Sequence, residues 1–133
     1  FSENAQLQIF DALKRNREKR NKLQSFIVEG VRNINNAVKY NWNIQSFMYS
    51  TEHGLSQWAT NILHISRAQT HYDLTEKLLE KLSFKEETSE LLAAVKIRKD
   101  DIHTISLNSR LLIVVFDRPA SPGNKFCQQY SYR

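Results

Sequence analysis

Residues 12–36 read ALKRNREKRNKLQSFIVEGVRNINN and contain three consecutive signals. A dense basic run comes first, with six Lys and Arg side chains and one acid, Glu18. The apolar residues 26–28 follow, and Glu29-Gly30 then leads into a helical pattern. A strand that passes through a glycine turn into a helix is typical of an α/β unit. Basic side chains at the front of such a unit favour contact with nucleic-acid phosphates.

The spacing of apolar residues predicts further helices and short strands on both sides of this stretch. Before it we expect a helix over residues 5–13, capped by Asn4 and fraying through the basic run. Residues 26–28 are expected to form a short buried strand, and residues 90–98 a central one. The other predicted elements are helices at residues 31–41, 55–63 and 75–82, the last capped by Thr75, and strands at residues 44–49 and 71–74. The predicted fold class is therefore α/β, a small domain of alternating helices and short strands.

A second apolar run, LLIVVF, occupies residues 111–116 and precedes the loop DRPASPGN. It is expected to be a buried strand that begins another parallel sheet, with the loop at the edge where such sheets bind ligands. Residues 125–133, KFCQQYSYR, show no apolar periodicity. The predicted organisation is a domain over residues 1–99, a polar linker over residues 100–110, and the truncated start of a second domain over residues 111–133.

Charge is distributed unevenly along the 133 residues, whose net charge is +5. Residues 1–50 carry a net charge of +4, residues 51–109 carry −2, and residues 110–133 carry +3. Basic charge at the two ends of the chain and acidic charge between them indicate that one side of the protein faces a polyanion. No apolar run approaches the ~18 residues of a membrane helix. The single cysteine, Cys127, excludes an internal disulfide and fits a reducing compartment, so we expect a cytoplasmic protein that does not bind membranes.

The basic run supplies the candidate site for nucleic acid. Its charges are dense and almost uncompensated, so their repulsion weakens a free helix, and contact with phosphates would relieve it. The alternative is a solvated helix surface without a partner. Arg17 and Arg20 are the strongest candidates, since guanidinium groups match phosphate oxygens and stack on bases. The complete predicted RNA-binding set is Lys14, Arg15, Arg17, Arg20, Lys22 and Arg32.

Other polar residues do not form a catalytic, cofactor or metal signature in the sequence. The histidines lack the spacing and partners of metal ligands, and Cys127 has no neighbouring histidine base. Gly30 is interpreted as the residue of a tight turn, and Glu29 as an acid near the positive N-terminus of the next helix. Trp42, at a predicted helix end, fits either the core or a surface that stacks on bases.

The order of three motifs resembles the SpoU (TrmH-type) family of RNA ribose 2′-O-methyltransferases. The basic run that closes on Phe26-Ile27-Val28-Glu29-Gly30 is similar to that family's F-x-x-E-G entry to the substrate-binding domain. Residues 90–95, ELLAAV, are placed like the strand that ends this domain. Residues 111–124 are similar to the first catalytic motif, a hydrophobic strand followed by D-x-x-x-x-P-x-N.

This resemblance implies that residues 1–99 bind structured RNA, either ribosomal or transfer RNA. It implies that residue 111 begins a knotted catalytic domain that binds S-adenosylmethionine and usually dimerises. The family motif continues as N-x-G-x-x-x-R, but Phe126 and Tyr130 occupy the Gly and Arg positions here. We therefore expect no cofactor site in this chain and no methyl transfer by it alone. We also expect either a homodimer or an LLIVVF strand packed on its own domain. The alternatives are a stand-alone RNA-binding module and a protein-interaction domain that docks through LLIVVF.

Overall fold

The computed structural model describes residues 3–99 and, beyond them, residues 101, 103, 105, 106, 108 and 110–113. The chain divides after Lys99 into two units, the first of which holds the α-helices and strands. Their order is α1 (Glu3–Arg15), α2 (Arg17–Leu23), β1 (Ser25–Glu29), α3 (Val31–Lys39), β2 (Ile44–Tyr49), α4 (Gln57–Ile65), β3 (Thr70–Asp73), α5 (Glu76–Leu82) and β4 (Leu92–Lys96). The α/β class is confirmed.

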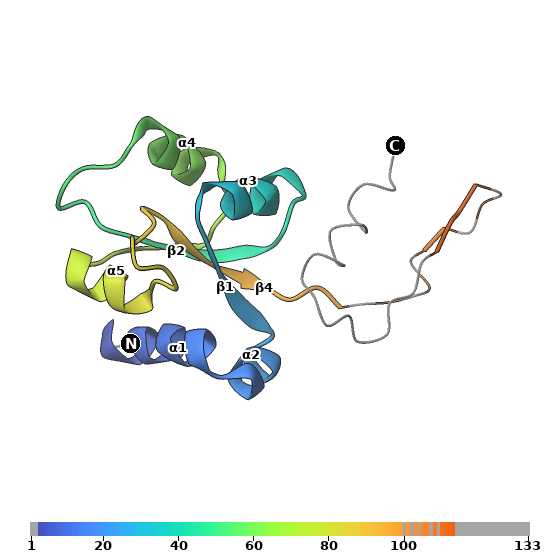
Figure 1. The fold of residues 1–133 in the computed structure, drawn as a ribbon, viewed down its shortest axis with the longest axis horizontal. Helices are drawn as coiled ribbons and strands as arrows, with labels where there is room; N and C mark the ends of the chain where they lie inside the picture. Colours follow the sequence, from blue (N-terminus) through green and yellow to red (C-terminus); the bar gives the residue numbers. More distant parts are fainter. Residues whose placement is uncertain are drawn as a thin grey trace. The chain divides into compact units, whose positions relative to one another are not determined.

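One four-stranded sheet has the order β1-β4-β2-β3 (Figure 1). Strand β4 runs antiparallel to both β1 and β2, and β2 pairs with β3 in parallel. Residues 92–95 are all buried, because helices cover both faces of the sheet, and such strands are apolar along their whole length. The central strand predicted within residues 90–98 is confirmed, although it is shorter at both ends.

Two hydrophobic clusters lie on opposite faces of this sheet. Helices α3 and α4 cover one face, and α1 and α5 cover the other (Figure 1). Phe47 belongs to the cluster under α3 and α4, whereas its neighbour Met48 belongs to the cluster under α1 and α5. Both side chains are fully buried, as expected when successive residues of a strand point to opposite faces.

Strand β1 differs from its prediction because it is an edge strand. Among the described strands it pairs with β4 alone, and Phe26, Ile27 and Val28 are half-buried rather than buried. The first helix also begins two residues earlier than predicted, at Glu3, so Asn4 lies inside α1 and is not its cap. Thr75 does occupy the N-cap position of α5, but its side chain makes no capping hydrogen bond there.

Residues 17–22 of the basic run form a separate helix, α2, and not the frayed end of α1, which ends with Lys14 and Arg15. Asn16 interrupts the helical backbone with an extended conformation (φ −119°, ψ 114°). Its side-chain oxygen accepts hydrogen bonds from the backbone N–H groups of Glu18 (2.8 Å) and Lys19 (3.2 Å). An N-cap of this kind satisfies donors that the first turn of a helix leaves open. The cap therefore explains why the basic residues stay helical despite their mutual repulsion.

The strand predicted over residues 111–116 lies mostly outside the described residues. Residues 111–113 have no regular secondary structure. Leu112 is 75% exposed and Ile113 is 55% exposed, so the burial predicted for these two side chains is not observed. Asn124 and Cys127 also lie outside the described part. Among the helices that the structure describes, none has the length and apolar character needed to cross a membrane.

Candidate nucleic-acid interface

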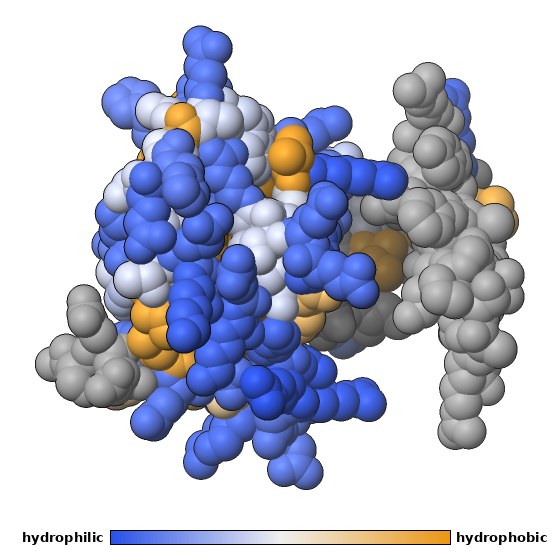
Figure 2. Space-filling view, turned by 60° about the vertical axis from the view of Figure 1, so that its left-hand side comes forward, coloured by the Kyte–Doolittle hydropathy of each residue, from blue (hydrophilic) through white to orange (hydrophobic). Residues whose placement is uncertain are grey.

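Helix α2 presents the basic run at the protein surface. None of its seven residues is buried, and Glu18 is its only acid. Hydrophilic side chains dominate the lower part of the domain in Figure 2, where Figure 1 places α1 and α2. A helix without an apolar face gains little from packing, so its position depends on its caps and on contacts of individual side chains.

Three basic side chains of α2 are free of protein partners. Arg17, Lys19 and Lys22 are exposed, and no hydrogen bond or ion pair joins them to any residue in the described part of the chain. Lys19 and Lys22 are three residues apart and are therefore neighbours on the helix surface. Lys19 was not in the predicted set, although the cap at Asn16 makes it part of the same helix. These charges are available to an external anion.

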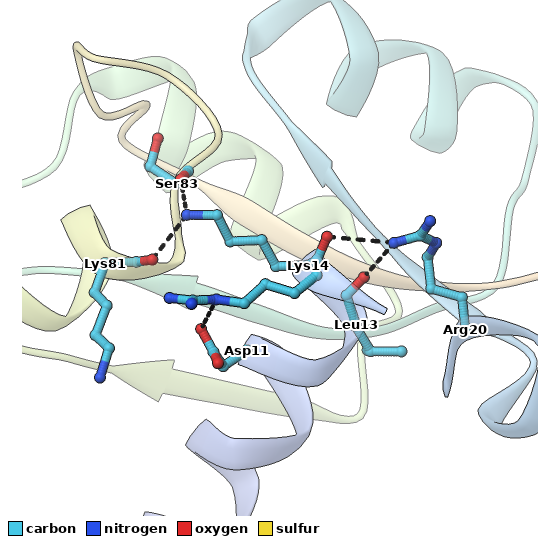
Figure 3. Close-up of polar contacts among 7 residues, drawn as sticks. Asp11, Leu13, Lys14, Arg20, Lys81 and Ser83 are labelled. Atoms are coloured by element: carbon cyan, nitrogen blue, oxygen red, sulfur yellow. Dashed lines mark hydrogen bonds and ion pairs between the residues drawn. The ribbon is translucent and has the colours of Figure 1, made fainter. Parts of the chain in front are cut away.

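Arg20 connects α2 to α1 (Figure 3). Its Nη1 donates hydrogen bonds to the backbone oxygens of Leu13 (3.0 Å) and Lys14 (3.3 Å). The last carbonyl groups of a helix lack partners within it, and a guanidinium group suits them because it carries several donors and a positive charge. Arg20 was predicted to be a leading phosphate contact. In the structure, its Nη1 holds α2 against the end of α1.

Lys14 and Arg15, at the end of α1, are also engaged within the protein, and Figure 3 shows the contacts of Lys14. The Lys14 ammonium donates to the backbone oxygens of Lys81 (2.9 Å) and Ser83, at the end of α5. Arg15 forms an ion pair with Asp11, with 3.0 Å between Nε and Oδ1. Arg32 is exposed on α3, which covers the opposite face of the sheet from α1. The structure therefore does not gather the predicted set into one free cluster.

Replacing Arg20 by Ala is expected to lower the free energy of unfolding by about 1.5 kcal/mol, because two carbonyl groups at the end of α1 lose a charged donor. Arg17→Ala is the matched control in the same helix, and we expect a change within about 0.5 kcal/mol. Urea unfolding followed by circular dichroism measures both values. Equal effects of the two substitutions would contradict the positioning role of Arg20.

Glu29, at the end of β1, holds the segment that follows α5. The side chain is 6% exposed. Its Oε1 accepts hydrogen bonds from the Ser83 hydroxyl (2.5 Å) and the Ser89 N–H (3.2 Å), and Oε2 accepts one from the Phe84 N–H (2.7 Å). Burial raises the pKa of Glu29, but these hydrogen bonds outweigh it, so the pKa lies below its ordinary value. The sequence interpretation, which placed Glu29 at a helix N-terminus, missed this role because its partners lie more than 50 residues away.

Gly30 makes the predicted turn between β1 and α3. Its φ of +90° lies in the region that favours glycine. A Cβ atom at this position would also lie 2.8 Å from the Lys85 ammonium. The F-x-x-E-G motif is thus explained by a buried carboxylate and a turn, and neither residue provides an exposed functional group.

Comparison with known proteins supports the motif order seen in the sequence. Residues 4–93 match the family described as SpoU L30e-like domain. The chain is also 37% identical over 123 residues to a 23S rRNA (uridine(2479)-2′-O)-methyltransferase from Streptomyces viridochromogenes. That alignment covers 92% of this chain and 43% of the relative, so the chain spans less than half of the relative's length.

Solved structures share the same fold. The SpoU methyltransferase AviRb from Streptomyces viridochromogenes, in complex with AdoMet, matches with a TM-score of 0.79 and 38% identity, over 91% of this chain and 46% of that one. An RNA 2′-O ribose methyltransferase matches with a TM-score of 0.68, over 84% of this chain and 42% of that one, and at 19% identity this shows the fold alone. The family match covers every strand of the sheet except the end of β4. The chain belongs to the SpoU family of proteins with an L30e-like domain.

Proposed function

We propose that residues 1–99 are the RNA-binding domain of a ribosomal RNA ribose 2′-O-methyltransferase and that α2 contacts the phosphates. The observation that carries this proposal is the set of exposed side chains of Arg17, Lys19 and Lys22, on one short helix whose position is fixed by Asn16 and Arg20. These three charges form no ion pair with an acid of the described domain, so they attract phosphate groups. The relative from Streptomyces viridochromogenes is named for action on 23S rRNA, which supports proposing ribosomal RNA and not transfer RNA as the substrate.

The proposal extends to the order of domains along the chain. Residues 100–110 would be the linker, and residues 111–133 would begin the catalytic domain. We assign the methyl donor, which is bound in the AviRb structure, to that domain and to no residue up to Lys99. The role of residues 1–99 is to hold RNA so that a ribose 2′-hydroxyl faces the catalytic domain. The proposal includes a cytoplasmic location and a homodimer.

The salt dependence of RNA binding tests this proposal. The probe is a folded 23S rRNA transcript that spans uridine 2479, the nucleotide in the relative's name, and transfer RNA is the second probe. With three phosphate contacts, we expect the logarithm of the affinity to fall against the logarithm of the salt concentration with a slope of about −2 to −3. Fluorescence anisotropy measures the slope. Affinity that does not change with salt would contradict a phosphate-binding role for α2.

A further inference from the structure

A groove of about 520 Å³ lies between β1 and α3. Its apolar wall includes Phe26, Val28, Ala37, Val95 and Trp42. The size and the apolar lining are those of a small-molecule or nucleobase site. The groove exists because β1 is an edge strand whose apolar side chains are only half-buried.

Trp42 is held at this groove by the backbone that ends α3. Asn41 has a φ of +51°, and the Trp42 N–H donates to the Ala37 oxygen at 2.9 Å, which is the hydrogen-bond pattern of a Schellman motif. The Trp42 ring meets Phe26 edge to face, with 5.8 Å between ring centroids. The Arg98 guanidinium lies over the Trp42 ring, 4.5 Å from its centroid. An ordered aromatic ring beside a guanidinium plane is a surface on which bases stack.

Side-chain amides and a cation also line the groove. Asn33 and Asn36 lie one turn apart on α3 and both contribute to its wall. Asn33 uses its Nδ2 to donate to the Glu29 oxygen (2.9 Å), which leaves its oxygen as an acceptor. No hydrogen bond within the described residues occupies the Asn36 side chain. An amide that donates and accepts together matches the edge of a base, and Lys85, also in the wall, can neutralise an adjacent phosphate.

The groove runs along β1, and its end at Phe26 and Trp42 lies at the same end of the β1–β4 pair as α2, whereas Glu29 and Lys85 line its other end. Strand β1 begins two residues after α2 ends, and the Ile97 N–H donates to the Gln24 oxygen at 2.7 Å. Lys96 pairs with Ser25, the first residue of β1. Lys22, Lys96 and Arg98 therefore surround this end of the sheet. A strand of RNA whose phosphates contact α2 can continue past these cations to the groove.

We propose that this groove binds an unpaired nucleobase of the RNA, with its face against Trp42 and its edge at Asn36. The inference rests on the proposed RNA-binding function and adds to it, because phosphate contacts alone carry no preference for unpaired bases. It explains why aromatic rings, two amides and a cation line one groove. It also assigns to Trp42 the stacking role that the sequence left open.

The test uses the full chain with Trp58→Phe, which leaves Trp42 as its only tryptophan. Two RNA probes are compared, a 23S rRNA hairpin with an unpaired loop and a fully paired duplex of equal length. We expect the hairpin to quench Trp42 fluorescence and the duplex to bind without quenching. Asn36→Ala is expected to weaken hairpin binding about 10-fold and to leave the duplex unchanged. Asn61→Ala, the same change at an exposed site on α4, is the control.

The outcomes separate this inference from the proposed function. Salt-dependent binding of both RNAs, without quenching and with no effect of Asn36→Ala, would overturn the base site while the phosphate-binding role of α2 stands. Equal quenching by hairpin and duplex would likewise overturn it. If neither RNA binds, the proposed function fails and the base site fails with it.

Discussion

Glu29→Gln is expected to lower the free energy of unfolding by about 3 kcal/mol, the largest effect of a single conservative change in the F-x-x-E-G motif. The buried carboxylate accepts hydrogen bonds from the Ser83 hydroxyl and from the Phe84 and Ser89 N–H groups. A hydrogen bond to a charged group contributes about 1.5–3 kcal/mol. The Gln amide carries no charge. Its NH2 group is a donor and accepts no hydrogen bond from the hydroxyl and N–H groups that donate to Glu29. Urea unfolding followed by tryptophan fluorescence measures the loss.

The same carboxylate makes the stability of the domain depend on pH. The pKa of Glu29 is lower in the folded protein than its ordinary value of 4.5, so the unfolded chain binds more protons in acid. The contribution of Glu29 is therefore complete above pH 4.5 and is lost as the pH falls through the lower, folded-state pKa. We expect Glu29→Gln to remove this part of the acid dependence.

The matched control for Glu29 is Glu87→Gln, because Glu87 is exposed in the same segment. It is expected to change the free energy of unfolding by less than about 0.5 kcal/mol. Equal stability of the Glu29 and Glu87 variants at neutral pH would show that the 83–89 segment does not depend on the buried carboxylate.

The triple variant Arg17→Gln/Lys19→Gln/Lys22→Gln is expected to bind the 23S rRNA transcript about 100-fold or more weakly, with the fold unchanged. These three side chains are exposed, so their replacement leaves no group of the domain without a partner. A charge-assisted hydrogen bond contributes about 1.5 kcal/mol or more, and each lost phosphate contact makes the salt slope less steep by about 1. Affinity measurements across a salt series give both values.

A second triple variant, Arg67→Gln/Lys77→Gln/Lys81→Gln, is the control for net charge. It removes three charges from exposed sites after α4 and on α5. We expect a much smaller loss of affinity and a nearly unchanged slope, because diffuse attraction is screened at moderate salt. Similar losses for the two triple variants would mean that net charge, and not the position of α2, determines binding.

Periodicity in the sequence predicted most of the sheet. Strand β2 was predicted with its observed bounds, and the apolar run before Lys96 gave a central strand, because burial on both faces leaves an unbroken apolar pattern. The position of a strand at the edge of a sheet produces no such distinctive pattern in the sequence. Residues 26–28 are equally apolar, yet in the described part of the chain β1 has one neighbouring strand and half-buried side chains.

The sequence predicted a basic RNA-binding run with six named residues, and their contact with RNA stays a prediction. The sequence identified the run but could not show that Lys14 and Arg20 donate to backbone carbonyl groups, since those contacts depend on how helices end in space. One local signal was available: Asn16 is a favoured N-cap residue followed by a charged turn, and it predicts a second helix. The partners of Glu29 and the groove at Trp42 depend on tertiary contacts that no local pattern contains.

The most direct test of the central claim is to map the RNA-contacting surface by amide chemical-shift perturbation. Isotope-labelled chain is titrated with the 23S rRNA hairpin, and shifts are followed for every assigned amide. We predict that the largest shifts fall in α2, Arg17–Leu23, and in the following residues 24–26, with α5, Glu76–Leu82, unaffected. Shifts concentrated in α4 and α5, with α2 unchanged, would contradict the claim that α2 binds the RNA.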